Sequence, residues 1–123
     1  MALTFSILIT DNISGSGLQP LREDDQFELV EINDSSSKDF LNALASADGL
    51  IVRSATKVDS EMLVQAQDLK VIGRAGVGVD NIDLDAATER GVAVLNAPAG
   101  NTVSAAELTL ALMLSVVRRV PGA

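Results

Sequence analysis

Two arginines are the residues whose type and spacing could do chemistry. Arg53 follows the apolar run 49–52, and Arg74 follows a second apolar run that ends at Gly73. Arginine presents a planar fork of donors that suits a carboxylate or a phosphate. Neighbouring parallel strands lie about 4.8 Å apart. If the two runs are neighbouring strands, both guanidinium groups can reach one anion.

A glycine-rich segment, GRAGVGVDN at 73–81, surrounds the second arginine. It fails the dinucleotide fingerprint, because the third glycine position counted from Gly76 is Asn81, and because no acid ends the next apolar run. We interpret it as a loop with bare backbone N–H groups that a ligand can approach closely. The alternative is that the glycines only turn the chain. The predicted substrate-binding residues are Arg53, Ser54, Arg74, Gly76, Gly78, Val79 and Asn101, of which Asn101 could equally cap a helix.

The composition excludes several kinds of chemistry. The 123 residues contain no His and no Cys, which excludes Cys nucleophiles, His general bases, Cys/His zinc sites and disulfides. A net charge of −8 argues against a nucleic-acid or anionic-membrane surface. The longest apolar run is too short to span a bilayer. We expect a soluble, cytoplasmic protein without a metal site and without nucleic-acid or membrane partners.

The elements that must position these residues alternate between strands and helices. Apolar runs predict strands at 5–10, 27–32, 49–52, 70–73 and 92–95. Helical spacing and capping residues predict helices at 14–22, around 40–47, around 60–66, at 83–90 and at 104–119.

This order of elements predicts a flavodoxin-like, doubly wound α/β domain with a five-stranded parallel sheet. The alternating segment 27–32 suits an edge strand with one wet face, which favours the strand order 2-1-3-4-5. Ligands of such sheets bind outside the carboxyl ends of the strands. The residues to examine there are Asp11, 53–54, 74–80 and 96–102.

The last predicted helix, 104–119, opens with the capping box Ser104-x-x-Glu107 and is apolar almost all round. One sheet can cover only one side of such a helix. We therefore expect a second domain or a second subunit to cover the rest, and we predict a homo-oligomer that associates through this helix.

Three segments also resemble a known family. They are IVRSATKV at 51–58, VIGRAGVGVDNID at 71–83 and NAPAGNTVSAAE at 96–107, and together they resemble the NAD-dependent D-2-hydroxyacid dehydrogenases. The resemblance is nearly continuous over 49–123. The segment RSATKV and the arginine before AGVG are more similar to members that act on 3-phosphoglycerate than to those that act on glyoxylate or lactate.

The resemblance implies an enzyme of serine biosynthesis that oxidises 3-phospho-D-glycerate to 3-phosphohydroxypyruvate with NAD. It implies that Arg53 and Arg74 bind the substrate's phosphate and carboxylate. The backbone amides of Gly78 and Val79 would hold the carboxylate, assisted by Asn101. The residues implied near the nicotinamide are Val77 and Thr102, and those implied to order the loop are Asp80 and Asn81.

The resemblance further implies two lobes, with the catalytic His and the NAD lobe in sequence beyond this chain. We expect 1–100 to form most of the substrate-binding lobe and 101–123 to form an interdomain helix leading toward a NAD-binding domain. We expect these 123 residues alone to be inactive, with no catalytic residue. The alternatives are a stand-alone anion-binding or interaction module, and a phosphorylated receiver domain. A receiver domain needs an Asp after the third strand and a Lys after the fifth, where this chain has Arg53 and Asn96.

Overall fold

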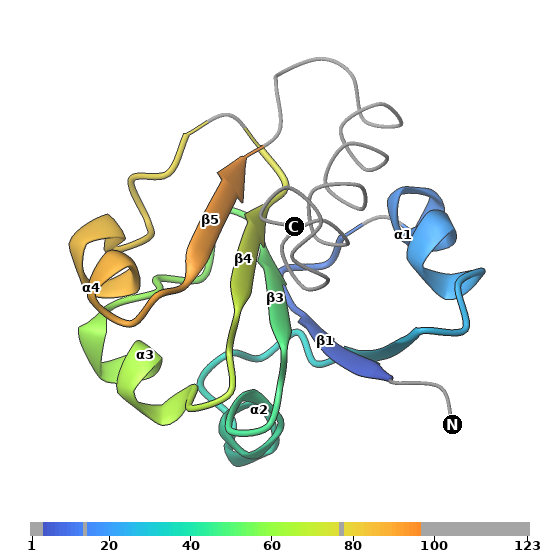
Figure 1. Cartoon of the computed structure of the whole chain (residues 1–123). Coiled ribbons are helices and arrows are strands. Elements are labelled where there is room, and N and C mark those ends of the chain that lie inside the picture. The colour runs from blue at the N-terminus through green and yellow to red at the C-terminus, as the bar shows by residue number, and fades with distance from the viewer. Residues whose placement is uncertain (1–3, 14, 77, 97–123) are drawn as a thin grey trace, which may run out of the picture.

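Five parallel strands form the centre of the molecule. The computed structural model describes residues 4–13, 15–76 and 78–96. The strands are β1 (Phe5–Ile9), β2 (Phe27–Glu31), β3 (Gly49–Val52), β4 (Val71–Arg74) and β5 (Ala93–Asn96), in the order β2-β1-β3-β4-β5 (Figure 1). The predicted fold class and strand order are confirmed, and each strand begins and ends within one residue of its prediction.

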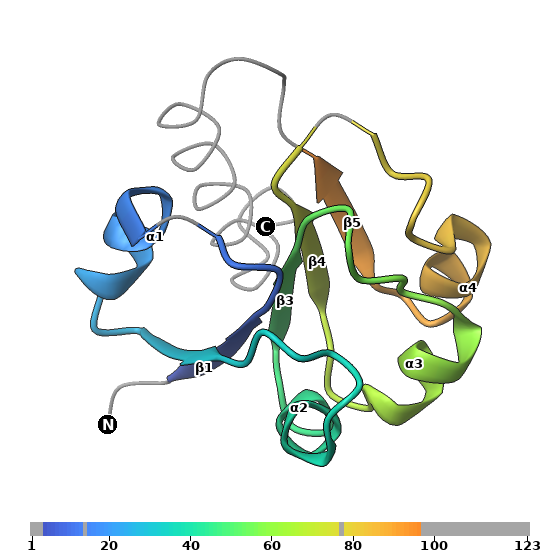
Figure 2. The ribbon, with the colours of Figure 1, turned by 180° about the vertical axis from the view of Figure 1, so that it is seen from behind.

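Helices cover both faces of this sheet (Figures 1 and 2). The described helices are α1 (Gly15–Arg22), α2 (Lys38–Leu44), α3 (Ser60–Gln65) and α4 (Leu84–Glu89). One face carries α2, α3 and α4, while α1 lies on the opposite face. Within the described ranges no helix has the length and apolar composition that crossing a membrane requires. The predicted helix 104–119, its oligomer contact and the interdomain segment 101–123 lie outside the described residues.

The helix boundaries follow from short polar side chains. Ser37, Asp59 and Asp83 are the N-caps of α2, α3 and α4, and each side chain accepts a hydrogen bond from the backbone N–H three residues later. Such caps satisfy N–H groups that have no partner inside the helix. Gly91, with φ of 71°, follows α4 in the left-handed conformation that glycine adopts without strain. These caps and the glycine therefore set the bounds of helices that the sequence predicted.

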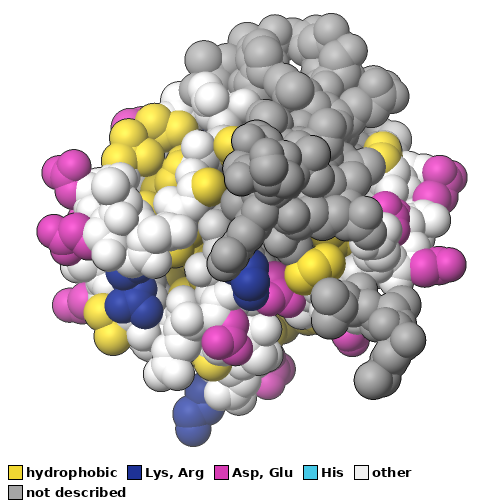
Figure 3. Space-filling model, in the orientation of Figure 1, with side chains coloured by type: hydrophobic (Ala, Val, Ile, Leu, Met, Phe, Trp, Pro, Cys, Tyr) yellow, Lys and Arg dark blue, Asp and Glu magenta, His cyan; other side chains and the backbone are white. Residues whose placement is uncertain are grey.

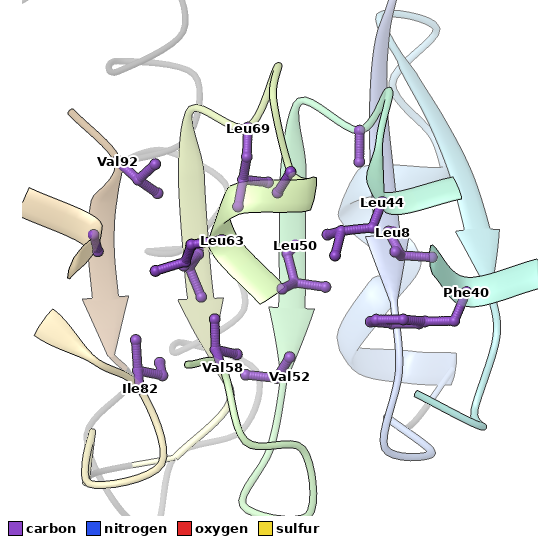
Figure 4. Close-up of a cluster of buried hydrophobic side chains, with 14 residues drawn as sticks. Leu8, Phe40, Leu44, Leu50, Val52, Val58, Leu63, Leu69, Ile82 and Val92 are labelled. Carbon is purple, nitrogen blue, oxygen red and sulfur yellow. The ribbon is translucent and has the colours of Figure 1, made fainter. Parts of the chain in front are cut away.

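The hydrophobic core is divided by the sheet into two clusters. The larger one lies between the sheet and α2–α4, where Phe40, Leu50 and Leu63 are buried (Figure 4). The smaller one lies on the α1 side and includes Leu18 and Leu21. Because the central strands are buried on both faces, β3 is apolar throughout, as is typical of parallel sheets.

Strand β2 lies at the sheet edge, as predicted, but the expectation of one wet face is wrong. Leu29 packs against the smaller cluster and Val30 against the larger one, so both faces of β2 are partly covered. The regular alternation is interrupted by these two adjacent apolar residues. Glu28 and Glu31 are exposed on opposite sides of the strand.

Candidate functional site

The candidate site lies at the carboxyl edge of the sheet, where β3 and β4 end side by side. In the strand register Val52 pairs with Arg74, and Arg74 pairs with Asn96. Arg53 follows one residue beyond Val52 and is exposed, whereas Arg74 is half-buried. The sheet therefore brings the two arginines to neighbouring strand ends. Their common contact with one anion stays a prediction.

The turn 53–56, which contains Arg53, is held by a side chain from the end of β1. The Asp11 carboxylate accepts hydrogen bonds from the N–H groups of Arg53 (2.9 Å) and Thr56 (3.0 Å) through Oδ2. Its Oδ1 accepts a third, from the Thr56 hydroxyl (2.5 Å). Thr56 is buried beneath the turn. A residue 42 positions earlier in the chain thus fixes the backbone at Arg53.

Asn81, from the loop after β4, holds the same turn from its other side. Its Nδ2 donates hydrogen bonds to the carbonyl oxygens of Arg53 and Thr56, both at 2.7 Å. The backbone N–H of Val58 donates to the Asn81 carbonyl at 2.8 Å. The expectation that Asn81 orders the loop is consistent with these bonds, and the loop it orders includes the turn at Arg53.

Arg74 is positioned differently, because its side chain folds back over its own loop. A Cβ atom added at Gly76 would lie 2.8 Å from Arg74 Nη1, and one added at Gly78 would lie 3.6 Å from the same atom. The Arg74 Nε is buried and has no hydrogen-bond partner among the described residues. Buried polar groups nearly always have a partner. An anion that accepts from this guanidinium would supply one.

A shallow hollow beside this loop has the opposite charge. It is lined by residues of the segment 78–85, including the carboxylates of Asp80, Asp83 and Asp85. On the face shown in Figure 3, the described residues present more acidic than basic side chains. Like charges repel a phosphate, so an anion is favoured at the arginines rather than in this hollow. Among the described residues no group of three or more His, Cys, Asp or Glu side chains is arranged to hold a metal ion.

Comparison with known proteins identifies the family. The family model "D-isomer specific 2-hydroxyacid dehydrogenase, catalytic domain" matches residues 7–118. The chain belongs to this family.

Among individual proteins, the chain is 50% identical over 119 residues to the D-3-phosphoglycerate dehydrogenase of Bacillus subtilis (strain 168), covering 97% of the chain. It is 44% identical over 117 residues to the D-3-phosphoglycerate dehydrogenase of Archaeoglobus fulgidus, covering 95% of the chain. In both cases the chain spans 22% of the relative's own length.

Solved structures give the same fold. The chain superposes on the NAD+-bound 3-phosphoglycerate dehydrogenase of Entamoeba histolytica with a TM-score of 0.69 and 30% identity, over 91% of this chain and 39% of that one. The TT0316 protein of Thermus thermophilus gives a TM-score of 0.68 and 38% identity, over 96% of this chain and 38% of that one.

The loop between β4 and α4 does not fit the pyrophosphate of a dinucleotide. The N-terminus of α4 is capped by the Asp83 carboxylate, which accepts from the Ala86 N–H at 3.0 Å and takes a donor that a phosphate would need. Asp80 and Asp85 line the hollow beside it and add negative charge there. The Asp83 cap and the carboxylates of Asp80 and Asp85 thus leave this loop unsuited to the pyrophosphate of NAD.

The other predicted site residues are distributed as follows. Ser54 is exposed in the turn after Arg53, Gly78 is exposed, and Val79 is half-buried with its carbonyl accepting from the Ile82 N–H at 3.0 Å. The predicted Val77, Asn101 and Thr102 lie outside the described residues. Their roles, like those of the described residues, stay predictions.

Sequence reasoning assigned no role to Asp11, the residue that contributes most hydrogen bonds to the turn. A signal was present, since Asp11 and Asn12 follow a strand and both types tolerate the left-handed conformation at a turn. Their φ angles are 68° and 54°. Nothing in the local sequence shows, however, that the Asp11 carboxylate reaches a turn more than 40 residues away.

Proposed function

We propose that this chain is the substrate-binding part of an NAD-dependent 3-phosphoglycerate dehydrogenase. The reaction oxidises 3-phospho-D-glycerate to 3-phosphohydroxypyruvate, a step of serine biosynthesis. The observation that carries the proposal is the buried Nε of Arg74, which has no hydrogen-bond partner within residues 4–13, 15–76 and 78–96, beside a turn that presents Arg53. The names of the curated relatives support the same substrate.

The proposed substrate is a three-carbon acid with a carboxylate at one end and a phosphate at the other. Arg53 and Arg74 supply the two guanidinium groups that pair with these anions. Charge-assisted hydrogen bonds contribute roughly 1.5–3 kcal/mol each. Backbone N–H groups of the loop at Gly78 and Val79 add neutral donors, and Asn101 adds an amide. The predicted bare N–H of Gly76 is not available, because it donates to the Arg74 carbonyl at 2.9 Å. These groups bind the substrate and fix its orientation.

We assign no step of hydride transfer to this chain. The sequence contains no His to take the proton of the substrate hydroxyl, and the loop between β4 and α4 does not fit the pyrophosphate of a dinucleotide. In the proposed division of labour, 1–100 bind the substrate, 101–123 connect to a NAD-binding domain, and these 123 residues alone show no dehydrogenase activity.

The test is a steady-state assay of the complete gene product that includes these residues. With NAD, we expect NADH to form with 3-phospho-D-glycerate at a kcat/KM at least about a hundredfold above that with D-lactate or glycolate, because only the phosphorylated acid engages both arginines. Equal rates with unphosphorylated acids would contradict the substrate.

A stand-alone anion-binding module is the second candidate, favoured by the fact that both arginines lie within this chain while no dinucleotide site is found among its described residues. It predicts that 3-phosphoglycerate binds but that no NADH forms under any condition with the complete gene product.

A further inference from the structure

Asp11 occupies an unusual place in the chain. It follows β1, and its carboxylate makes three hydrogen bonds to the turn 53–56, which follows β3. The sheet does not need these bonds, because β1 and β3 are already paired along 7–9, and the Thr10 N–H donates to the Ile51 carbonyl at 3.1 Å. The carboxylate therefore reaches beyond the sheet to the turn.

The backbone at Asp11 is left-handed at the point from which the carboxylate reaches the turn. Asp11 and Asn12 are the only non-glycine residues with positive φ in the described ranges. Most L residues avoid this conformation, but Asp and Asn adopt it more readily because their short side chains can form local hydrogen bonds. The residue type at position 11 therefore suits both the turn of the chain and the bonds of the carboxylate.

The contacts on the turn leave the Arg53 side chain exposed while its main chain is fixed. The Arg53 N–H donates to Asp11, and its carbonyl accepts from Asn81. The next residue, Ser54, is exposed within the same turn. The directions in which the side chains of Arg53 and Ser54 leave the backbone are thus set by Asp11 on one side and Asn81 on the other.

From this geometry we propose that Asp11 is a positioning residue for anion binding, which orients Arg53 and Ser54 toward the substrate's phosphate or carboxylate. The inference rests on the proposed function for the identity of the anion. A positioning role differs from a purely structural role in its effect on binding. Loss of the Asp11 carboxylate should weaken anion binding more than a substitution elsewhere that lowers stability by the same amount.

Three variants separate these roles. Asp11→Gly accepts the positive φ without strain and removes all three acceptors. Asp11→Asn keeps an oxygen for the two N–H donors, and its amide can donate to the Thr56 hydroxyl, so it should restore most of the positioning. The matched control is Asp48→Ala, because Asp48 accepts from the Ser6 N–H at 2.9 Å and from Lys70 Nζ at 2.6 Å at the amino edge of the sheet, far from the arginines.

The experiment titrates each form of the 123-residue chain with 3-phosphoglycerate and follows backbone amide shifts by NMR, alongside urea unfolding. We expect Asp11→Gly to raise Kd about tenfold, and Asp11→Asn to stay within about threefold of the wild type. Asp48→Ala should lose stability but keep its affinity. In an Arg53→Ala background the effect of Asp11→Gly should vanish. An unchanged Kd in Asp11→Gly, or an equal rise in Asp48→Ala, would overturn the proposal.

A second readout keeps the proposed function and this inference apart. Absence of any 3-phosphoglycerate binding by the wild-type chain would contradict the proposed substrate. The positioning of the turn is then decided by amide hydrogen exchange at Arg53 and Thr56. We expect protection in the wild type and in Asp48→Ala and at least about tenfold faster exchange in Asp11→Gly. Equal protection in all three forms would show that Asp11 does not fix the turn.

Discussion

Two loops meet at the carboxyl edge of the sheet, and they are held in opposite ways. The turn 53–56 is bonded from both sides by the side chains of Asp11 and Asn81. The loop that begins at Arg74 has backbone bonds from the Ala75 N–H to the Val52 carbonyl (2.8 Å) and from the Gly76 N–H to the Arg74 carbonyl (2.9 Å). The Arg74 Nε in that loop has no partner among the described residues.

The proposed anion site would therefore combine an ordered turn with a donor that has no partner among the described residues. A preorganised turn loses little conformational entropy when a ligand binds. A buried donor without a partner destabilises the free protein, and binding of an anion removes that penalty. We expect Arg53 to set the geometry of binding and Arg74 to contribute most of its free energy.

The largest expected effect is that of Arg74→Ala on affinity. Removing this guanidinium should weaken 3-phosphoglycerate binding roughly 10- to 100-fold, because it deletes the donor that has no other partner among the described residues. Calorimetric titration or KM of the complete gene product measures the effect. Arg90→Ala is the matched control, since Arg90 is exposed at the C-cap of α4, away from the carboxyl edge. Equal losses in the two variants would remove Arg74 from the site.

Asn81→Ala tests the turn 53–56 from the side opposite Asp11. The substitution removes the Asn81 amide, which donates to the carbonyl oxygens of Arg53 and Thr56. We therefore expect the free energy of unfolding to fall by about 1–3 kcal/mol. Urea unfolding measures this value. Asn42→Ala, at an exposed position of α2, should change it by less than about 0.5 kcal/mol. A loss below that of the control would show that the two 2.7 Å bonds do not stabilise the turn.

Gly76→Ala tests the loop that begins at Arg74. The new Cβ would lie 2.8 Å from Arg74 Nη1, the far end of a flexible side chain, so the guanidinium should move while stability changes by less than about 1 kcal/mol. We expect affinity for 3-phosphoglycerate to fall about three- to tenfold.

Gly15→Ala is the control for this substitution, because a Cβ there meets nothing within 4 Å. The double variant Gly76→Ala with Arg74→Ala decides whether Gly76 makes room for the Arg74 side chain or for the ligand. If Gly76 makes room for the Arg74 side chain, Gly76→Ala has no further effect once that side chain is gone. A persistent effect would instead support the sequence-based interpretation that the glycine admits the ligand itself.

The smallest effect concerns a carboxylate outside both loops. The Ser36 hydroxyl, and then the Ser36 N–H, donate to Asp34 and lower its pKa from the ordinary value of 3.8. A carboxyl whose pKa is lowered by folding stabilises the native state above its unfolded pKa, and this contribution is lost as the pH falls through the folded pKa. The unfolding free energy of the wild type should therefore approach that of Asp34→Asn below pH 3.8 and exceed it above.

Urea unfolding of both forms across that pH range measures the difference. Because Asp34 is exposed, the difference should be much smaller than that caused by Asn81→Ala. A difference that does not change with pH would show that the Ser36 bonds do not act through the ionised carboxylate.

The sequence predicted most of the fold and part of the site, for identifiable physical reasons. Strand order and helix caps depend on short-range patterns, such as the apolar run at β3 and Asp59 before α3, which are visible in a few residues. The turn at Arg53 depends on Asp11 and Asn81, which are separated from it by 42 and 28 positions, so no local pattern reveals their bonds.

Two further features depend on side-chain packing. The Arg74 side chain folds back over Gly76 because it adopts one rotamer among several, and the spacing of the glycines does not determine that rotamer. The covered faces of β2 depend on which helices reach the sheet edge, and the alternation of 27–32 does not reveal that cover.

The convergence of distant segments on the turn 53–56 has a consequence for folding. The hydrogen bonds of this turn require Asp11, at the end of β1, and Asn81, in the loop after β4, to lie beside it at the same time. The chain between Asp11 and the turn, and the chain between the turn and Asn81, must therefore fold back before these bonds can form. Partly folded forms that lack either segment then have no ordered Arg53. A ligand that binds only the completed edge stabilises the native state over all such forms, by RT ln(1 + [L]/Kd). Such a ligand would raise the stability of the native state most when its concentration is well above Kd.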